Sequence, residues 1–260
     1  MQYAIERGVN TLEMDVSVTK DNVLVLSHNP HLLPEICLTP EGLSTSEIPI
    51  RSLTLKQLQK FDCGSLRNPR FPKQVTVPGT PPPTLMEVFH LGEILSNGKI
   101  HYNIETKIAL DWDPALTPTP EQFAALINKA ITAAGVDKRT IIQSFDTRTL
   151  TALRNMGSQV RTALLVGADR KDVDSKKLIG EAKRIGADIV SPEWHLVTPS
   201  LVKAAHAAGV AVIPWTINDR EAMHKVIAAN VDGMISDDVD LMMDVVKEEF
   251  RLGQESCWQD

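Results

Sequence analysis

The sequence predicts an α/β protein of the TIM type, a (β/α)8 barrel, from three observations. Apolar runs typical of buried strands alternate with amphipathic segments typical of helices through most of the chain. A strand followed by a helix, repeated many times, gives a parallel sheet. The length of 260 residues suits a single barrel, because this fold typically takes about 250 residues. No G-x-G-x-x-G motif follows an early strand, so a dinucleotide-binding sheet has no support.

The expected elements follow one another in a regular order. We expect strands at residues 11–18, 22–27, 100–106, 140–145, 160–166, 187–191, 210–217 and 232–236. We expect helices at residues 84–96, 120–134, 146–156, 173–185, 198–208, 218–229 and 238–250. Glycines mark the ends of several helices as C-caps, namely Gly135, Gly157, Gly186 and Gly209. The expected N-caps are Asp146, Thr198 and Asn218, the last with Glu221 at capping-box spacing.

The first residues of the sequence predict the C-terminal part of a helix. Residues 1–8 are typical of the last turns of a helix that ends at Gly8. No signal peptide precedes this helix, so the sequence as written suits a cytoplasmic protein. A periplasmic or secreted protein is the alternative, if a further N-terminal segment carries a signal peptide.

Residues 30–83 interrupt the alternation of strands and helices. They are rich in proline and contain one short helical piece at residues 54–61, and they are too long for an ordinary connection. We interpret them as an insertion on the rim of one barrel domain that spans residues 1–260. A separate domain is disfavoured, because a Pro-rich segment with few large apolar residues could hardly bury a core. Insertions on the catalytic face of a barrel usually shape the substrate pocket.

Composition excludes several classes of protein. The formal net charge of −6 and the pI near 5.7 argue against a nucleic-acid binder, which needs a basic surface. No apolar run approaches the roughly 20 residues of a membrane-spanning helix, so stable membrane insertion is not expected. The three cysteines, Cys37, Cys63 and Cys257, are scattered. Their spacing indicates neither a zinc site nor a disulfide, and we expect isolated thiols.

Two strands carry the acidic residues that point to chemistry. Glu13 and Asp15 share one face of the first strand, because side chains alternate across a strand. The opposite face is apolar and we expect helices to cover it, so these acidic side chains should point into the barrel. Glu105 lies similarly on a later strand. Carboxylate oxygens are the ligands of hard cations, so we predict one divalent cation bound by Glu13, Asp15 and Glu105; the alternative is an exposed edge strand.

A lysine and a histidine complete the predicted site. Lys107 follows Glu105 by two residues, where it would offset the acidic charge and contact an anionic phosphate. His28 lies at the end of the second strand, where a group that titrates near neutrality suits a general acid for an alkoxide leaving group. His31 is a nearby alternative for that role.

Further candidates lie where other strands end. Gln143, Phe145 and Trp215 are expected to position substrate, although aromatic residues at such places are as often part of the core. For Glu193 we favour an ordinary rim carboxylate over a site residue. For the remaining histidines we expect structural roles: His90, His101, His195, His206 and His224.

Taken in order, these segments resemble the glycerophosphodiester phosphodiesterase family. The resemblance is carried by residues 8–16 with Thr19-Lys20-Asp21, and by residues 25–30, 83–88, 103–107, 143–146, 215–218 and 231–237. It spans nearly the whole chain. No single segment is decisive, but the ordered set is highly specific.

The resemblance implies a phospholipase-C-like (β/α)8 barrel that hydrolyses glycerophosphodiesters to sn-glycerol 3-phosphate and an alcohol. By similarity, Glu13, Asp15 and Glu105 would bind a divalent cation, usually calcium or magnesium. Lys107 would help to hold the phosphate, and His28 would be one of two catalytic histidines, protonating the leaving alcohol. The insertion at residues 30–83 would bind the glycerol moiety of this small-molecule substrate. Nothing in the sequence indicates the oligomeric state or the headgroup alcohol.

The chain departs from the family at its beginning. The family's first strand ends in a His-Arg-Gly motif, followed by Pro-Glu-Asn-Thr, and nothing in this sequence matches it. That strand supplies the second catalytic histidine and a phosphate-binding arginine, so the expected barrel lacks its first strand and has an open seam. One explanation is a mis-assigned gene start or a trimmed N-terminus. The other is a degenerate relative that binds metal or phosphodiester without turnover.

A third class is a phospholipase-like barrel that acts on lipid at a membrane surface. Its rim would carry apolar or basic residues. The insertion offers basic residues but no aromatic cluster, so we rank this class below the other two; the basic residues are Arg51, Lys56, Lys60, Arg67, Arg70 and Lys73.

Overall fold

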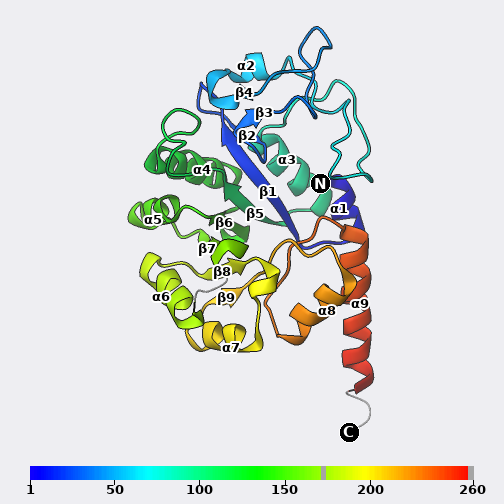
Figure 1. The fold of residues 1–260 in the computed structure, drawn as a ribbon, viewed down its shortest axis with the longest axis vertical. Helices are drawn as coiled ribbons and strands as arrows, with labels where there is room; N and C mark the ends of the chain where they lie inside the picture. The colour runs from blue at the N-terminus through cyan, green and yellow to red at the C-terminus, as the bar shows by residue number, and fades with distance from the viewer. Residues whose placement is uncertain (171–173, 257–260) are drawn as a thin grey trace.

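Parallel strands lie at the centre of the molecule and helices surround them, in a computed structural model that describes residues 1–170 and 174–256 (Figure 1). The central sheet has seven strands in the order β2-β1-β5-β6-β7-β8-β9. All neighbours from β1 onward are parallel, and β2 pairs antiparallel with β1. The strands are β1 (Thr11–Val18), β2 (Leu24–Leu26), β5 (His101–Thr106), β6 (Thr140–Ser144), β7 (Arg161–Val166), β8 (Ile189–Pro192) and β9 (Ala211–Val212). The α/β class predicted from the alternation is confirmed.

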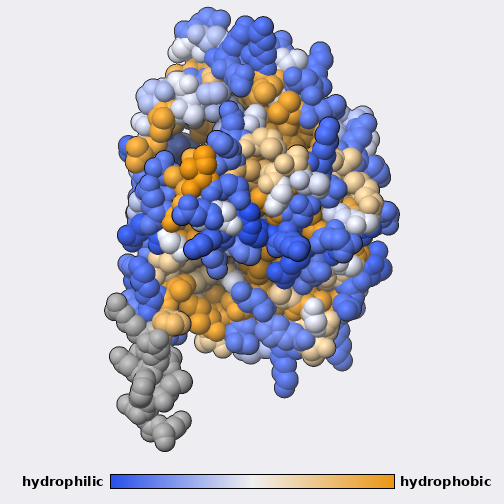
Figure 2. Space-filling view, turned by 180° about the vertical axis from the view of Figure 1, so that it is seen from behind, coloured by the Kyte–Doolittle hydropathy of each residue, from blue (hydrophilic) through white to orange (hydrophobic). Residues whose placement is uncertain are grey.

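The helices follow the expected positions closely. Those of the outer ring are α1 (Gln2–Arg7), α3 (Leu85–Ser96), α4 (Pro120–Ala134), α5 (Thr147–Asn155), α6 (Ser175–Ile185), α7 (Pro199–Ala207), α8 (Arg220–Ala228) and α9 (Val239–Ser256). Figure 1 shows the start of α9 next to α1, and Asp240 of α9 bonds to Tyr3 and Arg7 of α1. No helix among the described residues is long and apolar enough to cross a membrane. Figure 2 shows hydrophilic side chains over much of the rear face, with apolar ones in separate patches.

Most helix ends lie at or within one residue of the expected caps. Asp146 and Thr198 are N-caps as expected, and Gly8, Gly135 and Gly186 are left-handed C-caps. Gly157 and Gly209 are also left-handed but come one residue after the capping residue. The N-cap of α8 is Asp219, not Asn218. Asn218 is engaged elsewhere, because its amide bonds to residues 236 and 237.

The last expected strands are shorter than predicted. Of residues 210–217 only β9 is assigned as a strand. Pro214 has no N–H to donate to a ladder, and beyond it the segment pairs again through a parallel bridge between Trp215 and Glu193. Residues 232–236 are not assigned as a strand, but they run beside that segment through Asp232 N–Val212 O and Ile235 N–Pro214 O hydrogen bonds. Within the described residues no β-pairing links 232–236 to β1, so the sheet is open between them.

The two faces of β1 separate the core from the site. Leu12, Met14 and Val16 are buried against the surrounding helices, and they belong to the main apolar core. Because side chains alternate along a strand, Glu13 and Asp15 lie on the opposite, inner face. Burial of the apolar face therefore fixes the direction of the acidic side chains, since a one-residue slip would exchange the two faces.

The insertion lies at the end toward which β1 points, at the top of Figure 1. It contains the two-stranded sheet of β3 (His31–Leu32) and β4 (Ile48–Pro49) and the short helix α2 (Leu55–Leu58). Its small apolar cluster includes Leu32, Ile50 and Leu58, and also Val25 of β2. A cluster of this kind was not expected, and its sharing of Val25 fastens the insertion to the barrel.

The expectation of isolated thiols is wrong for two cysteines. Cys37 and Cys63 form a disulfide with a Cα–Cα distance of 4.0 Å. The pairing depends on an antiparallel bridge between Leu38 and Asp62, which brings the two chain segments side by side. Cysteine spacing along the sequence carries no trace of this contact. Cys257 lies outside the described residues.

Candidate functional site

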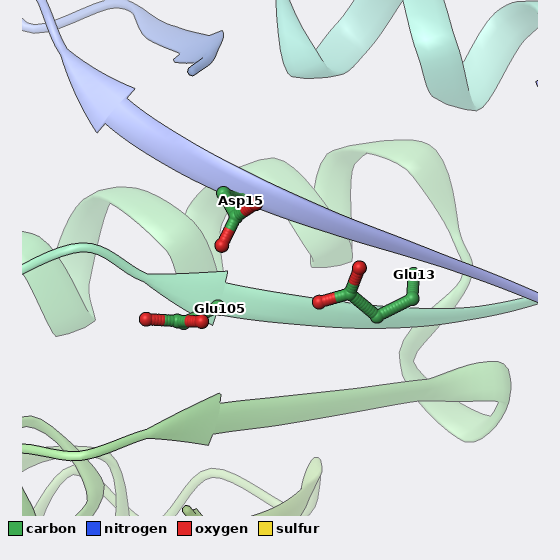
Figure 3. A group of neighbouring side chains, drawn as sticks. All are labelled: Glu13, Asp15 and Glu105. Carbon is green, nitrogen blue, oxygen red and sulfur yellow. The ribbon is translucent and has the colours of Figure 1, made fainter. Parts of the chain in front are cut away.

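Three carboxylates converge from two neighbouring strands. Glu13 and Asp15 come from β1 and Glu105 from β5, and one oxygen of each lies within 4.8 Å of the others (Figure 3). The parallel register places Asp15 directly opposite Glu105. Strand pairing therefore builds the cluster that the sequence predicted, from residues far apart along the chain.

The electrostatics of this cluster favour a bound cation. Burial raises the pKa of Glu13, and the neighbouring Asp15 and Glu105 raise it further. Burial likewise raises the pKa of Glu105, against the opposing effect of Lys107. Carboxylates crowded in this way resist ionising together unless positive charge compensates them. Three oxygen donors of this type fit a hard divalent cation such as Ca²⁺ or Mg²⁺.

Lys107 lies beside the carboxylates and remains charged. Its Nζ is 2.8 Å from Glu105 Oε1 and 3.6 Å from Asp15 Oδ1. Burial alone would lower the pKa of Lys107, but the Glu105 and Asp15 carboxylates outweigh burial and raise it. The site therefore keeps a positive charge beside its acidic cluster, as an anionic ligand requires.

His28 stands at the rim of the same site. The residue is exposed on one side, but its surroundings remove part of the water around the imidazole, which lowers its pKa, and the positive charge of Lys107 lowers it further. The free protein therefore favours a neutral imidazole at pH 7. An anion bound beside it would raise its proton affinity. His31, the alternative histidine, also lines this pocket.

A pocket of ≈ 630 Å³ joins these groups to the insertion. Every residue predicted for the site lines it: Glu13, Asp15, His28, Glu105, Lys107, Gln143, Phe145 and Trp215. The insertion contributes the opposite wall, including Asn68, Arg70 and Phe71. The insertion thus borders the pocket, and the pocket presents both positive and negative charge to a ligand of small-molecule size.

The aromatic candidates meet at one side of the pocket. The Phe145 and Trp215 rings pack edge to face with centroids 5.5 Å apart. Trp215 Nε1 donates to Ser191 O at 2.8 Å, which holds the indole in place. Phe145 is 46% exposed, so its ring is open to a ligand. Glu193 does not line the pocket, and its carboxylate accepts hydrogen bonds from His195.

Several pocket residues were not predicted. Arg70 and Asn68 come from the Pro-rich insertion, whose sequence has no periodicity from which a direction can be inferred. Asp237 also lines the pocket, and Asn218 donates to its carboxylate. The sequence did indicate Asp237, because it follows the last expected strand at the end of the barrel where active-site residues gather, but no role was assigned to it.

Comparison with known proteins identifies relatives of this chain. The model of the glycerophosphoryl diester phosphodiesterase family matches residues 1–241. The glycerophosphodiester phosphodiesterase of Caldanaerobacter subterraneus subsp. tengcongensis is 29% identical over 245 residues, which are 94% of this chain and 89% of that protein.

Solved structures share the fold. A Silicibacter pomeroyi protein, described as a candidate glycerophosphoryl diester phosphodiesterase, superposes with a TM-score of 0.86 at 25% identity, over 95% of this chain and 86% of its own. An Oleispira antarctica phosphodiesterase, solved with the product sn-glycerol-3-phosphate, has a TM-score of 0.74 at 18% identity, over 95% of this chain and 88% of its own. The predicted barrel type is therefore supported by relatives of the whole chain.

Proposed function

The chain belongs to the glycerophosphoryl diester phosphodiesterase family, and from this premise we propose that it hydrolyses glycerophosphodiesters to sn-glycerol 3-phosphate and an alcohol. One observation carries the proposal. Three carboxylates, a charged lysine and a histidine line a single pocket. The curated relative from Caldanaerobacter and the product-bound relative from Oleispira support the same reaction.

Glu13, Asp15 and Glu105 would hold the cation, which we propose to be Ca²⁺ or Mg²⁺. When bound, it would neutralise charge on a phosphate oxygen and polarise the attacking water or glycerol hydroxyl. Lys107 lines the pocket beside these carboxylates, and its charge there offsets the negative charge that builds on the phosphoryl oxygens.

His28 donates a proton to the departing alkoxide. The phosphodiester anion in the pocket raises the pKa of His28 from its lowered value in the free protein, so the ring is protonated when the substrate is bound. Phe145 and Trp215 contact the non-phosphate part of the substrate, and the insertion closes over the glycerol moiety.

One observation favours a second candidate function. Among the described residues that line the pocket, a proton donor is assigned but not a group that accepts the nucleophile's proton. Loss of one acid or base group typically lowers a rate by about 10²–10⁴-fold. A protein that binds cation and phosphodiester without turnover is therefore the alternative.

A hydrolysis assay separates the two functions. The purified chain is incubated with glycerophosphocholine and CaCl₂ or MgCl₂, and released glycerol 3-phosphate is measured with a coupled dehydrogenase. We expect release that chelation stops and that Glu105→Ala abolishes, with an unchanged circular dichroism spectrum. Cation binding by calorimetry without any release, even at high protein concentration, would establish the binding-only alternative. Release that continues at the wild-type rate in Glu105→Ala would refute the assigned site.

A further inference from the structure

A chain of buried amide hydrogen bonds leads from the middle of the sheet to one of the carboxylates. Asn103 Nδ2 donates to Gln143 Oε1 at 2.9 Å, and Gln143 Nε2 donates to Glu13 Oε1 at 2.7 Å. The three residues come from adjacent strands, β5, β6 and β1. Asn103 is 4% exposed and Gln143 is 2% exposed, so bulk water does not compete for these bonds.

The chain of bonds has only one workable direction. A carboxylate that binds a cation is ionised, and an ionised carboxylate accepts hydrogen bonds and cannot donate them, so in the cation-bound site Gln143 must turn its NH₂ group toward Glu13. Its oxygen then faces Asn103 and needs a donor, which the Asn103 NH₂ group supplies. The reversed amide would set oxygen against oxygen. Asn103 thereby fixes the orientation of Gln143, and Gln143 fixes the Glu13 carboxylate.

Stability of the fold does not explain Asn103. Its Oδ1 is buried and has no hydrogen-bond partner among the described residues. A buried polar atom without a partner destabilises the folded state, whereas an apolar residue of similar size would not. The bond to Gln143 is what the amide contributes at this position.

The other two carboxylates are held differently. Lys107 contacts Asp15 and Glu105. For Glu13, the hydrogen bond recorded in the described part of the chain comes from Gln143. The charged Lys107 thus orients Asp15 and Glu105, whereas the neutral amide of Gln143 orients Glu13.

We propose that Gln143 and Asn103 are positioning residues that hold the Glu13 carboxylate in the direction a divalent cation needs. The inference rests on the proposed function, and it gives Gln143 a role other than contact with substrate. Groups that orient metal ligands typically contribute about 10–100-fold to metal affinity. Asn103 acts only through Gln143, so its effect depends on the presence of that amide.

Calorimetric titration with CaCl₂ and with MgCl₂ tests the proposal without any need for turnover. We expect Gln143→Met to weaken the cation Kd by about 10–100-fold, and Asn103→Leu to weaken it less. The double variant should bind no more weakly than Gln143→Met alone, because residues that act in series are not additive. Thr140→Val is the matched control. It removes a buried hydroxyl from the same strand, bonded to Val136 O and not to the site, and should leave Kd within about twofold.

Two results would overturn the proposal: a wild-type Kd in folded Gln143→Met, or full additivity of the two single variants. If Gln143→Met fails to fold, Gln143→Asn replaces it, since the shorter amide cannot bond Asn103 and Glu13 at once, and it must show the same weakening. A wild-type chain that binds neither cation would refute the metal site itself, and with it this inference. A wild-type chain that binds a cation, together with unaffected variants, would refute the inference alone.

Discussion

The two histidines that line the pocket differ in their surroundings. His28 follows β2 and is influenced by Lys107 and Asp15, whereas His31 begins β3 of the insertion and is half-buried. Both line the pocket, so shape alone does not assign the proton donor. The proximity of His28 to the charged groups favours it, because a proton donor must reach the bond that breaks.

We therefore expect His28→Ala to lower kcat for glycerophosphocholine by about 10²–10⁴-fold, the usual contribution of a general acid. His31→Ala, three positions along and in the same pocket, serves as the control and should change kcat little. Steady-state kinetics at saturating cation measures both. The opposite pattern would transfer the role of proton donor to His31.

The acidic cluster was predictable at the level of residues, and the disulfide was not. Alternation along a single strand sufficed to direct Glu13 and Asp15 away from the apolar face of β1. Cys37 and Cys63 meet only because irregular segments of the insertion cross. Local pattern determines which face a side chain takes, but not which loops come together.

At the scale of elements, an ion pair fixes α3 against the sheet. Arg139, just before β6, forms a salt bridge with Glu93 of α3 at 2.7 Å and also donates to Ile100 O. Tyr102 of β5 donates to the same glutamate at 2.9 Å. The pKa of Glu93 is lowered, first by Arg139 and against the effect of burial. Glu93 therefore stabilises the fold in its ionised form.

The lowered pKa of Glu93 predicts a pH dependence of stability. A carboxyl group whose pKa is lower in the folded than in the unfolded state stabilises the fold when it is ionised. This stabilisation is complete above the unfolded-state pKa of 4.5, and it is lost as the pH falls through the folded-state pKa. Glu93→Gln should therefore lower the free energy of unfolding at pH 7, and the difference should shrink below about pH 4.5. Urea unfolding at several pH values measures this. Glu121→Gln, at the exposed first turn of α4, is the control; a Glu93→Gln difference that is constant down to pH 3 would contradict the assignment.

Element boundaries were predictable where a local rule governs them. Thr84 and Thr119 form capping boxes, and left-handed glycines end α4 and α6, so these helices agree with the sequence to within two residues. The strand expected at 232–236 is the main failure. Among the described residues, its backbone hydrogen bonds to a neighbouring segment go to residues 212–217, on one side of it. The sequence pattern indicates that these residues are buried, but not how many neighbouring strands they pair with.

At the scale of the whole molecule, the pocket lies between two units of different construction. The barrel supplies the charged groups from regular strands, and the insertion supplies the opposite wall from irregular chain. The contacts that join the insertion to the barrel include Val25 in its apolar cluster, the Arg51 bonds to Thr19 and Asn22, and the Lys73–Asp238 ion pair near the start of α9. Its internal cross-link is the Cys37–Cys63 disulfide.

This arrangement predicts that the disulfide governs substrate binding more than the chemical step. The cross-link spans 26 residues, and closing a loop of this size stabilises the folded state by about 3–4 kcal/mol. In Cys37→Ser/Cys63→Ser the insertion loses this restraint, while the carboxylates on β1 and β5 remain held by strand pairing.

For this double variant we expect KM for glycerophosphocholine to rise, kcat to change little, and limited proteolysis within residues 64–83 to accelerate. The cation Kd should remain that of the wild type, because the insertion contributes none of the three carboxylates. A variant whose kcat and cation affinity fall together would show instead that the insertion supports the barrel strands themselves.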